Sequence, residues 1–576
     1  MKFTGPILLA IDMLIVADTI KSSILMSGVY CIKKITKKVT MKKQLGTIIS
    51  GSLTEGFEMR VHPGTQLEDI KTGKFVCITG NVYKFFSLIT DLQLAVTHPD
   101  ILLYPPSEQE SLLARMLKKR DIYATAILKP MLMLDHNQQT LPVKTIPHHF
   151  AQVHEASKKD VALIFGDEDN PTKNFFNIGC PLDMDIPVCI NLEKLTERSN
   201  GIFGKTGTGK TFITRLILAG LIKNDKAINL IFDMHSEYGL QARKEGGGFS
   251  FVKGLKTLFP DRVAIFSLDP VSTRRRGGNP DVEIVLNYQS IQVEDILSLQ
   301  DELNLHPTAL EAAYLIAGHY KKDWLQVLLN QGDNLKEFAQ SIGAHPESIA
   351  ALYRKLKSIE RLPFFKPVQA GVYKEASVID QMMEYIDRGI NIVVEFGNFT
   401  STFVYLLIAN IITRRIHKAY IAKTEVFLGS QKKEHEPKKL MITIEEAHKF
   451  LNPHAARQTI FGTIAREMRK YYVSLLVVDQ RPSGIDQEII SQIGTKIVAQ
   501  LNDEKDIQAV LMGINNGQTL RAILSSLDSK KQALVLGHAV AMPVVVQTRE
   551  YNEAFYQAMS TTVSPQQIDE FVNELF

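Results

Sequence analysis

One short stretch decides the fold: Gly204-Lys205-Thr206-Gly207-Thr208-Gly209-Lys210-Thr211. It fits the pattern GxxxxGK[ST], carries an additional glycine at position 207, and follows an apolar strand that begins at Gly201. The apolar run 212–222 after it predicts a helix, so the stretch stands in the strand–loop–helix setting that a phosphate-binding loop requires. The sequence therefore predicts a nucleotide-binding α/β domain rather than a chance glycine-rich turn.

The chemistry of this loop assigns roles to its residues. Glycines let backbone N–H groups converge on phosphate oxygens, and the N-terminus of the following helix adds a favourable dipole. Lys210 is expected to reach the β- and γ-phosphates of ATP, and the Thr211 hydroxyl to ligate Mg²⁺. We predict that all eight residues, 204–211, bind the nucleotide.

A second apolar strand, 439–444, ends in two carboxylates, Glu445 and Glu446. We predict that Glu445 belongs to the Mg²⁺ shell and that Glu446 lies beside the γ-phosphate, where it polarises the attacking water. Glu445 is one methylene longer than the usual aspartate, so its contact to Mg²⁺ is either direct or mediated by a water molecule. Acid enrichment at a helix N-terminus is the alternative interpretation.

A third apolar strand, 475–478, ends at Asp479 and Gln480. If this strand lies between the first two, Gln480 is placed to sense the γ-phosphate and to position water. Just before it, Arg466 and Arg469 share a helix face because they are three residues apart. A guanidinium placed at a neighbouring subunit's nucleotide is an arginine finger, whereas an exposed basic face is the alternative.

Polar residues also follow the strand 228–232, namely Asp233, His235 and Glu237. Ligands of α/β sheets bind where strands end at a switch in strand order. These residues are therefore site candidates, although a structural turn explains them equally well.

The wider chain predicts three kinds of structure. Short β-branched segments between residues 45 and 100 predict a small β-domain, and from about residue 190 strands alternate with helices, as in a mainly parallel sheet. Between residues 282 and 383 apolar spacing instead predicts helices, at 293–303, 307–320 and 346–362. The predicted parts are an extension of uncertain role (1–40), a β-barrel with linker (41–185), the first part of the ATPase core (186–280), a helical insertion (281–385), the second part of the core (386–550) and a tail (551–576).

Composition bounds the function. The chain has 576 residues, 45% hydrophobic and 22% charged, and its net charge is 66 − 62 = +4. These values exclude a disordered chain, a fibrous repeat and a polytopic membrane protein, and they limit any DNA contact to local patches. The apolar segment 7–17 is interrupted by Asp12, so we expect no stable membrane insertion. Four cysteines in so long a chain indicate neither a disulfide framework nor zinc spacing, as expected for a cytoplasmic protein.

The order and spacing of these elements resembles the HerA family of hexameric ATPases, in the HerA/FtsK branch of RecA-like P-loop proteins. The resemblance covers about residues 41–550 and leaves out 1–40. Met468 stands where a glycine is common. The matching segments are Leu192-Glu-Lys-Leu with Arg198, Asp233-x-His-x-Glu-Tyr, Glu445-Glu-Ala-His, Ile464-Ala-Arg-Glu-x-Arg-Lys and Gln480-Arg-Pro-Ser with Asp486.

The resemblance implies a RecA-like P-loop core with an N-terminal small β-barrel and an all-α insertion. It implies a homo-hexameric helicase that translocates double-stranded DNA through a central pore, and it places the trans-acting arginine at Arg466 or Arg469. It also implies a partner: a NurA-type nuclease in DNA end resection, or a sirtuin-like or other nuclease effector in antiviral (anti-phage) defence.

Two basic segments are candidates for DNA contact. Arg274-Arg275-Arg276 precedes two glycines, and Arg243-Lys244 precedes a further glycine run. A few phosphate contacts multiplied by six subunits suffice for sequence-independent binding. Both segments are also typical of solvated turns.

Two other functions stay open at this point. One is a nucleotide-gated ring scaffold that assembles and activates an effector enzyme with little translocation. The other is a conjugation or secretion ATPase at a membrane, which the absence of a convincing membrane span disfavours. The leading hypothesis is an ATP-driven DNA translocase that acts with a partner in DNA repair or defence.

Overall fold

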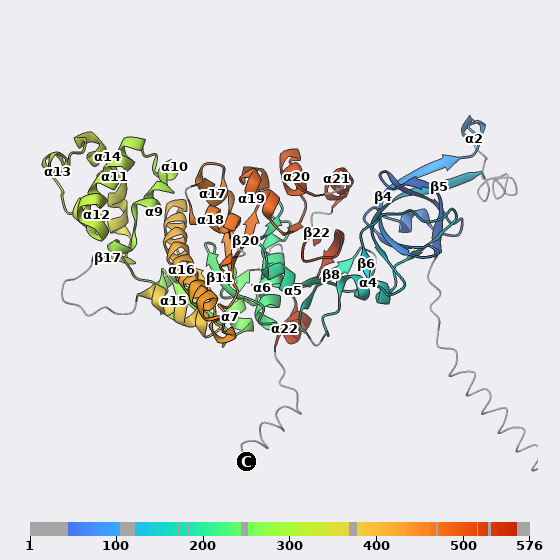
Figure 1. Cartoon of the computed structure of the whole chain (residues 1–576), viewed down its shortest axis with the longest axis horizontal. Coiled ribbons are helices and arrows are strands. Elements are labelled where there is room, and N and C mark those ends of the chain that lie inside the picture. Colours follow the sequence, from blue (N-terminus) through green and yellow to red (C-terminus); the bar gives the residue numbers. More distant parts are fainter. Residues whose placement is uncertain are drawn as a thin grey trace, which may run out of the picture.

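The β-barrel, the ATPase core and the helical insertion lie in a row along the long axis of the molecule (Figure 1). The computed structural model describes residues 44–103, 121–170, 172–182, 184–243, 251–367, 377–457, 459–467, 470–514, 517–527 and 531–560. The predicted extension 1–40 and residues 561–576 of the predicted tail (551–576) lie outside the described residues, whereas 553–559 form a helix.

The N-terminal strands form an antiparallel sheet that closes on itself. Their order is β2-β1-β7-β3-β4-β5-β6, and β2 pairs with β5 as well as with β1. Inward-facing residues such as Phe57, Met59 and Leu128 fill the interior, as in other small barrels. The predicted small β-barrel is confirmed. Its strands are β1 (Gln44–Ser52), β2 (Gly56–Val61), β3 (Phe75–Thr79), β4 (Lys84–Val96), β5 (Ile122–Leu134), β6 (Thr140–Leu141) and β7 (Gln152–Glu155).

The ATPase core is built on a mixed sheet of order β15-β14-β18-β11-β19-β20-β10-β21-β22-β23-β8-β9. Pairing is parallel from β15 to β21 and antiparallel from there to β9. Parallel strands are covered on both faces, which explains their continuous apolar runs. The strands are β8 (Phe175–Pro181), β9 (Val188–Asn191), β10 (Asn200–Phe203), β11 (Ile228–Asp233), β14 (Val263–Ser267), β15 (Val282–Glu283), β18 (Asn391–Glu395), β19 (Leu440–Glu445), β20 (Val473–Asp479), β21 (Thr495–Val498), β22 (Gln532–Gly537) and β23 (Val544–Thr548).

Strand β8 belongs to a different sheet from the one that the sequence predicted. It pairs with β23 in the core sheet, although the sequence assigned this segment to the barrel and linker. The predicted boundary at residue 185 therefore falls between β8 and β9, which extend the same sheet. The helices around the core are α4 (Lys158–Phe165), α5 (Leu192–Thr196), α6 (Lys210–Lys223), α7 (Leu255–Leu258), α8 (Pro270–Arg275), α15 (Val378–Asp387), α16 (Thr402–Ser430), α17 (His448–Leu451), α18 (Ile460–Glu467), α19 (Gln487–Gln492), α20 (Glu504–Leu511), α21 (Gly517–Ser526) and α22 (Glu553–Met559).

The insertion is a helical body that packs around Trp324. The indole of Trp324 is buried and its Nε1–H donates to the Ile291 carbonyl at 2.9 Å. The predicted helix 307–320 is confirmed as α11, whereas 293–303 is broken into two short helices. The elements are α9 (Val293–Leu297), α10 (Gln300–Leu303), α11 (Pro307–Tyr320), α12 (Trp324–Leu329), α13 (Leu335–Ser341) and α14 (Pro346–Leu356), with the short pair β16 (Leu286–Asn287) and β17 (Phe365–Lys366).

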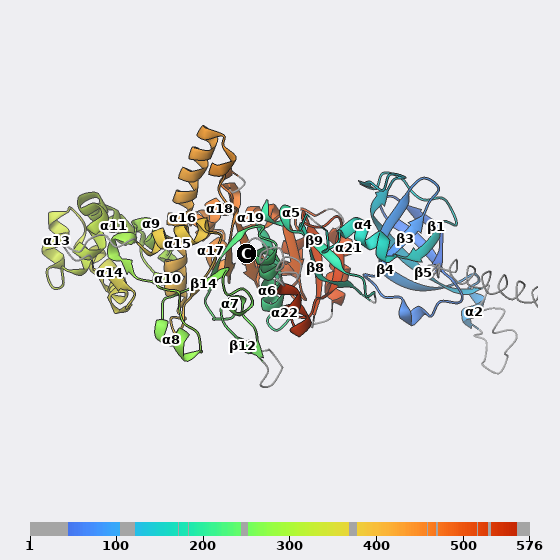
Figure 2. The same cartoon turned by 90° about the horizontal axis from the view of Figure 1, so that it is seen from below.

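Helix α16 joins the insertion to the core and rises out of the body in Figure 2. The run 413–418 on this helix is rich in basic residues, a pattern typical of a solvated surface face, but most of it is not exposed. Thr413 and His417 are buried, and Arg414 Nη2 lies 2.7 Å from the buried Asp295 of α9. The basic charge here serves packing between two elements.

The carboxyl ends of the parallel strands form a row of buried acids. Glu395, Asp233, Glu445 and Asp479 end the neighbouring strands β18, β11, β19 and β20. Such clustering of acids is costly unless each carboxylate has specific partners. The contacts of this row define the candidate site.

Candidate nucleotide-binding and catalytic site

The phosphate-binding loop connects β10 to α6 and depends on two glycines. Gly207 and Gly209 have φ of 79° and 91°, a left-handed conformation that side chains other than glycine adopt at a cost. Lys210 Nζ donates to the Lys205 carbonyl at 2.9 Å, and the Thr208 hydroxyl donates to the same oxygen at 2.7 Å. Lys210 is thereby held across the loop at the first turn of α6.

A cavity of about 140 Å³ opens above this loop, and we call it the nucleotide cavity. It brings together residues that the sequence assigned to separate motifs. Its lining residues are Thr206, Gly207, Gly209, Lys210, Thr211, His235, Glu237, Glu445, Glu446, Val478, Asp479 and Gln480. Gly204, Lys205 and Thr208 of the predicted loop are absent from this lining.

Glu446 and Gln480 form a hydrogen-bonded chain across the cavity. Gln480 Nε2 donates to Glu446 Oε1 at 2.8 Å, and the Thr206 hydroxyl donates to Gln480 Oε1. Strand β20 lies between β19 and β10, which is the condition under which the sequence placed Gln480 beside the phosphates. The chain joins the expected water-polarising carboxylate to the phosphate-binding loop.

Asp479 and His448 hold the hydrogen-bonded residues Gln480 and Glu446 in place, a role that the sequence did not predict. Asp479 accepts from the His448 backbone N–H at 2.6 Å and faces His448 Nδ1 at 3.0 Å. The hydrogen bond from Asp479 raises the pKa of His448, while burial opposes the shift. His448 Nδ1 lies 3.7 Å from Glu446 Oε2. The available signal was the polar residue at the end of a strand that is otherwise apolar.

Glu445 is gripped by two tyrosines. Tyr238 donates its hydroxyl to Glu445 Oε1 at 2.6 Å, and the Tyr405 hydroxyl bridges the Glu445 backbone N–H and C=O at 3.0 and 3.2 Å. Burial raises the pKa of the Glu445 carboxyl to about 8; Asp233, Glu237 and Glu446 raise it as well, against the Tyr238 hydrogen bond. Tyr238 belongs to the segment Asp233-x-His-x-Glu-Tyr, but the sequence pattern predicts no function for it.

The same site fits a magnesium ion. Glu445 Oε2 is buried and has no hydrogen-bond partner among the described residues, and the residue Glu445 lines the same cavity as Thr211. A carboxylate and a hydroxyl are oxygen ligands of the kind that Mg²⁺ prefers. An unpartnered buried carboxylate oxygen is costly, and a cation would satisfy it.

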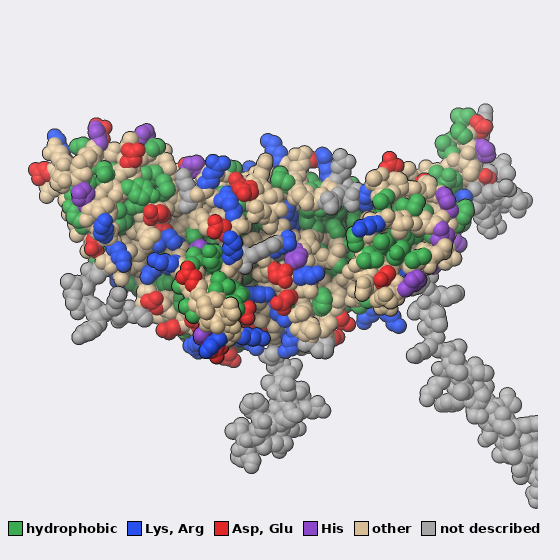
Figure 3. All heavy atoms as spheres, viewed as in Figure 1, with side chains coloured by type: hydrophobic (Ala, Val, Ile, Leu, Met, Phe, Trp, Pro, Cys, Tyr) green, Lys and Arg blue, Asp and Glu red, His purple; other side chains and the backbone are tan. Residues whose placement is uncertain are grey.

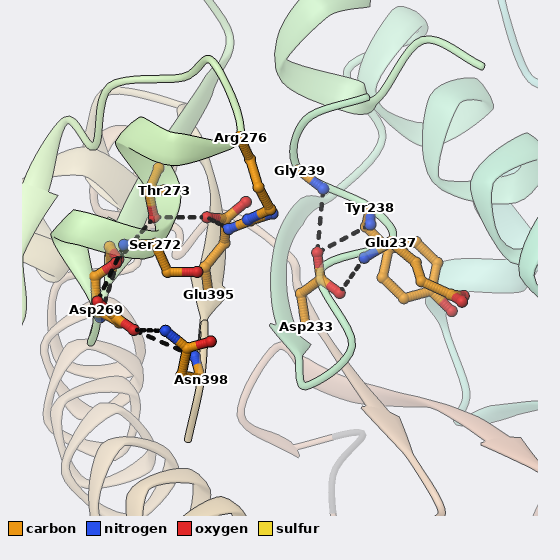
Figure 4. Close-up of polar contacts among 11 residues, drawn as sticks. Asp233, Glu237, Tyr238, Gly239, Asp269, Ser272, Thr273, Arg276, Glu395 and Asn398 are labelled. Atoms are coloured by element: carbon orange, nitrogen blue, oxygen red, sulfur yellow. Dashed lines mark hydrogen bonds and ion pairs between the residues drawn. The ribbon is translucent and has the colours of Figure 1, made fainter. Parts of the chain in front are cut away.

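Asp233 organises the loop that carries His235 and Glu237. Its carboxylate accepts from the backbone N–H groups of Glu237, Tyr238 and Gly239 at 2.7, 2.8 and 3.1 Å (Figure 4). Burial raises the pKa of Asp233 to about 6 and the neighbouring Glu395 adds to the rise, although the three N–H donors lower it. Asp233 therefore acts as a turn residue, while His235 and Glu237 reach the nucleotide cavity.

Arg466 and Arg198 lie at the opposite, amino-terminal ends of the parallel strands. They line a second cavity of about 1130 Å³ together with Lys439, Lys470 and Lys496, which we call the basic cavity. It sits where β10, β19, β20 and β21 begin. Since β20 has seven residues and a strand rises roughly 3.3 Å per residue, about 20 Å separates the two ends. Arg469 lies outside the described residues.

The segment Arg274–Arg276 lies at the end of a short helix rather than in a solvated turn. Arg274 and Arg275 belong to α8, whose N-cap Asp269 accepts from Ser272 N–H at 3.0 Å and from Asn398 Nδ2 at 2.8 Å. Arg276 turns inward to Glu395 in Figure 4. Arg274 and Arg275 are exposed, whereas Arg276 is half-buried. The side chain of Arg243 and all of Lys244 lie outside the described residues.

The chain is similar to known proteins. The family profile described as helicase HerA, central domain, matches residues 176–416, and the HAS barrel domain matches residues 45–147. The DNA double-strand break repair helicase HerA of Sulfurisphaera tokodaii is 24% identical over 456 residues, which cover 76% of this chain and 80% of the relative. That of Pyrococcus furiosus is 22% identical over 429 residues, covering 70% and 73%. Among solved structures, the plasmid coupling protein TrwB with a non-hydrolysable GTP analogue covers 64% of this chain and 88% of its own, with 12% identity and a TM-score of 0.43.

The sheet, the phosphate-binding loop and the acids at the strand ends define a P-loop ATPase core behind an N-terminal β-barrel. The chain belongs to the HerA family of helicases, which are ATP-hydrolysing enzymes. The predicted family, fold class and enzyme class are thereby confirmed. Within the described residues, none of the helices has the length and apolar character required to span a bilayer.

Proposed function

We propose that the protein is an ATP-driven helicase that translocates double-stranded DNA as a homo-hexameric ring and acts with a partner nuclease or effector in DNA end processing or defence. The observation that carries the proposal is that the proposed catalytic groups are divided between the two ends of the parallel strands. The nucleotide cavity holds Lys210, Glu446 and Gln480, while Arg198 and Arg466 lie at the opposite end. A site divided in this way is completed by a neighbouring subunit.

The residues of the nucleotide cavity have distinct tasks in hydrolysis. Lys210 and the N-terminus of α6 bind the β- and γ-phosphates of ATP. Glu446 accepts a proton from the attacking water, and Gln480, which already donates to Glu446, orients that water. Thr211 and Glu445 would hold Mg²⁺, which neutralises charge on the phosphates when bound.

A neighbour's guanidinium is the remaining catalytic group. Charge that develops on the transferred phosphoryl group is stabilised by an arginine finger by about 10³–10⁵ in rate. Within its own chain Arg466 is about 20 Å of strand away from the phosphates. This separation supports a role in trans for Arg466, with Arg198 beside it in the basic cavity.

The exposed arginines of α8 are the proposed DNA contacts. In Figure 2, α8 and the ribbon of β12 (Ala242–Arg243) and β13 (Phe251–Val252) project from the same side of the molecule. On the face shown in Figure 3, Lys and Arg side chains are interspersed with Asp and Glu. This distribution supports local contacts to the DNA backbone rather than a broad basic surface. Relatives described as DNA double-strand break repair helicases support the same substrate.

A triplex-displacement assay tests the proposal. The ring moves along blunt double-stranded DNA that carries a labelled third strand, and the strand is released only if the protein translocates on the duplex. Wild type should release it with ATP, and Glu446→Gln should bind the DNA without releasing it. If Glu446→Gln activates a partner nuclease as fully as wild type while neither releases the strand, the ring is a scaffold rather than a motor.

A further inference from the structure

The contact between Tyr238 and Glu445 joins the loop after β11 to the end of β19. Both side chains are buried: Tyr238 is 0% and Glu445 is 9% exposed. The Tyr238 hydroxyl lies 2.6 Å from Glu445 Oε1, within the range for a short O–H···O hydrogen bond to a carboxylate. The other oxygen, Oε2, has no partner among the described residues. The two oxygens of one carboxylate are thus used differently.

The position of Tyr238 is itself fixed by the fold. Its backbone N–H donates to the buried Asp233 at 2.8 Å. Arg215 of α6 donates from Nε to the Glu237 carbonyl at 2.9 Å, which braces the residue just before Tyr238. Gly239 follows with Glu395 Oε1 only 2.7 Å from where a Cβ would stand. The tyrosine therefore comes from a loop that is held on three sides.

The main chain of Glu445 is fixed separately. Tyr405 of α16 donates its hydroxyl to the Glu445 carbonyl at 3.2 Å and accepts from the Glu445 N–H at 3.0 Å. The backbone can therefore stay in place while the side chain changes direction. The remaining freedom of Glu445 lies in its side-chain torsions, and the hydrogen bond from Tyr238 limits that freedom.

We propose that Tyr238 is a positioning residue for magnesium: by holding Oε1 of Glu445, a residue that lines the nucleotide cavity, it leaves Oε2 as the oxygen that ligates the ion. The proposal rests on the proposed function, in which Glu445 belongs to the metal shell. Groups that hold a metal-binding carboxylate by hydrogen bonds typically change metal affinity or activity about 10- to 100-fold when removed. The hydroxyl of Tyr238 is the one group that this inference adds to the site.

Tyr238→Phe removes only the hydroxyl and tests the proposal. Binding of Mn²⁺, used in place of Mg²⁺, is measured by electron paramagnetic resonance on the full chain with ADP present. We expect Mn²⁺ affinity to fall about 10-fold or more, and ADP affinity without metal to stay at the wild-type value. ATP hydrolysis should require correspondingly more Mg²⁺ for half-maximal rate.

Tyr420→Phe is the matched control. Tyr420 is also a buried tyrosine of the core, and its hydroxyl donates to the Lys438 carbonyl at 3.1 Å, just before the other end of β19. The same atom is removed from the same strand's surroundings, far from the cavity. Tyr420→Phe should leave Mn²⁺ affinity unchanged, and equal losses in both variants would overturn the proposal.

A double-mutant cycle separates this proposal from the one on which it rests. Glu445→Gln should weaken Mn²⁺ binding, and adding Tyr238→Phe should then change it little, because the tyrosine acts through Glu445. If Glu445→Gln leaves Mn²⁺ affinity unchanged, the metal assignment of Glu445 is wrong. If only Tyr238→Phe has no effect, the positioning role is wrong. If Tyr238→Phe does not bind ADP at all, Asp233→Asn replaces it, because this variant weakens the support of the same loop. Asp233→Asn should then show a smaller loss of Mn²⁺ affinity. Unchanged Mn²⁺ affinity in Asp233→Asn would contradict the proposal.

Discussion

Glu446 adopts a backbone conformation that glutamate rarely takes. Its φ is 48°, in the left-handed region, and such strain costs on the order of 1–3 kcal/mol and clusters at functional sites. The surrounding contacts hold it there: Gln480 donates to its carboxylate, and the His448 N–H two residues on donates to Asp479. The turn directs the carboxylate into the nucleotide cavity beside Glu445, which remains on the strand.

The first prediction separates nucleotide binding from hydrolysis at this residue. Glu446→Gln should bind ATP with affinity near wild type, because Lys210 and the loop are unchanged, and should lose at least ~100-fold in turnover, since general-base catalysis contributes about 10²–10⁴. Lys210→Ala should weaken binding itself. Equilibrium binding of a fluorescent ATP analogue and steady-state ATPase assays measure the two effects. Wild-type turnover in Glu446→Gln would show that another group is the base.

A second prediction concerns the buried Lys496. Its Nζ donates to the Val510 and Met512 carbonyls at 2.9 and 3.2 Å, and burial lowers its pKa from 10.5 to about 8. Between these values the unfolded chain binds the proton more tightly, so stability contributed by this group rises with pH. From about pH 7 to 9.5 wild type should gain roughly 2 kcal/mol relative to Lys496→Met. Thermal unfolding of both proteins at the two pH values tests it, and a constant difference would contradict it.

At the scale of elements, α8 is a short helix held by what lies beneath it. Thr273 donates to Glu395 Oε2 at 2.9 Å, and Arg276 pairs with the same oxygen. Arg274, by contrast, pairs with Glu283 in solvent, where both side chains are 54% exposed. Exposed pairs contribute little to stability, whereas removing one partner of a buried pair leaves an uncompensated charge. Arg274 and Arg276 therefore have different tasks.

The third prediction separates these tasks. Arg274→Ala with Arg275→Ala should change stability by less than about 0.5 kcal/mol, but should lower duplex-stimulated ATPase activity and flatten the salt dependence of DNA binding. Arg276→Ala should lose on the order of 2–3 kcal/mol of stability. Adding Glu395→Gln should recover part of that loss, because the buried charge is removed. An unchanged response to DNA in the first variant would leave α8 a solvated helix.

At the scale of the whole molecule, the two cavities lie at opposite ends of the parallel strands. A chain with a phosphate-binding site at one end of its strands and arginines at the other end is suited to head-to-tail assembly. Such heterologous contacts close into a ring when the rotation between neighbouring subunits returns to the first subunit. Arg466 is meanwhile held by its own chain, with Nε 3.2 Å from Glu488 Oε2 and Nη1 donating to the Ala456 carbonyl at 2.9 Å. Its role in trans needs a test that a folding defect cannot imitate.

The fourth prediction uses complementation between subunits. Arg466→Ala should fold, assemble and bind ATP, but should lose about 10³–10⁵ in hydrolysis. Mixing it with Lys210→Ala should restore activity, because some interfaces then pair an intact loop with an intact arginine. Covalently linked subunits provide the strict form of the experiment. If mixed rings form and no linked arrangement hydrolyses ATP, Arg466 does not act in trans, and the same experiment on Arg469 follows.

The sequence by itself determined the local chemistry. The glycine pattern of 204–211 and the apolar strands that end at Glu445 and Gln480 are local signals, because positive φ, strand burial and strand-end polarity are encoded within a few residues. They were sufficient for the P-loop core, whereas the barrel was predicted from the short β-branched segments between residues 45 and 100. The grouping of Lys210, Glu446 and Gln480 in one cavity was predicted on the condition that the third strand lies between the other two. Strand order added only the confirmation that β20 lies between β19 and β10.

Only the tertiary structure decided which charged groups face solvent and which hold the core together. The local sequence around Arg414 and Arg276 does not distinguish them from exposed arginines. Each nevertheless forms a hydrogen bond to a buried acid that lies 119 residues away in the sequence. Tyr238 likewise meets Glu445 across 207 residues, and β8 joins the core sheet through β23. These pairings depend on long-range packing, and no local periodicity records them, because a side chain's partner is set by the strand order and not by its neighbours in the chain.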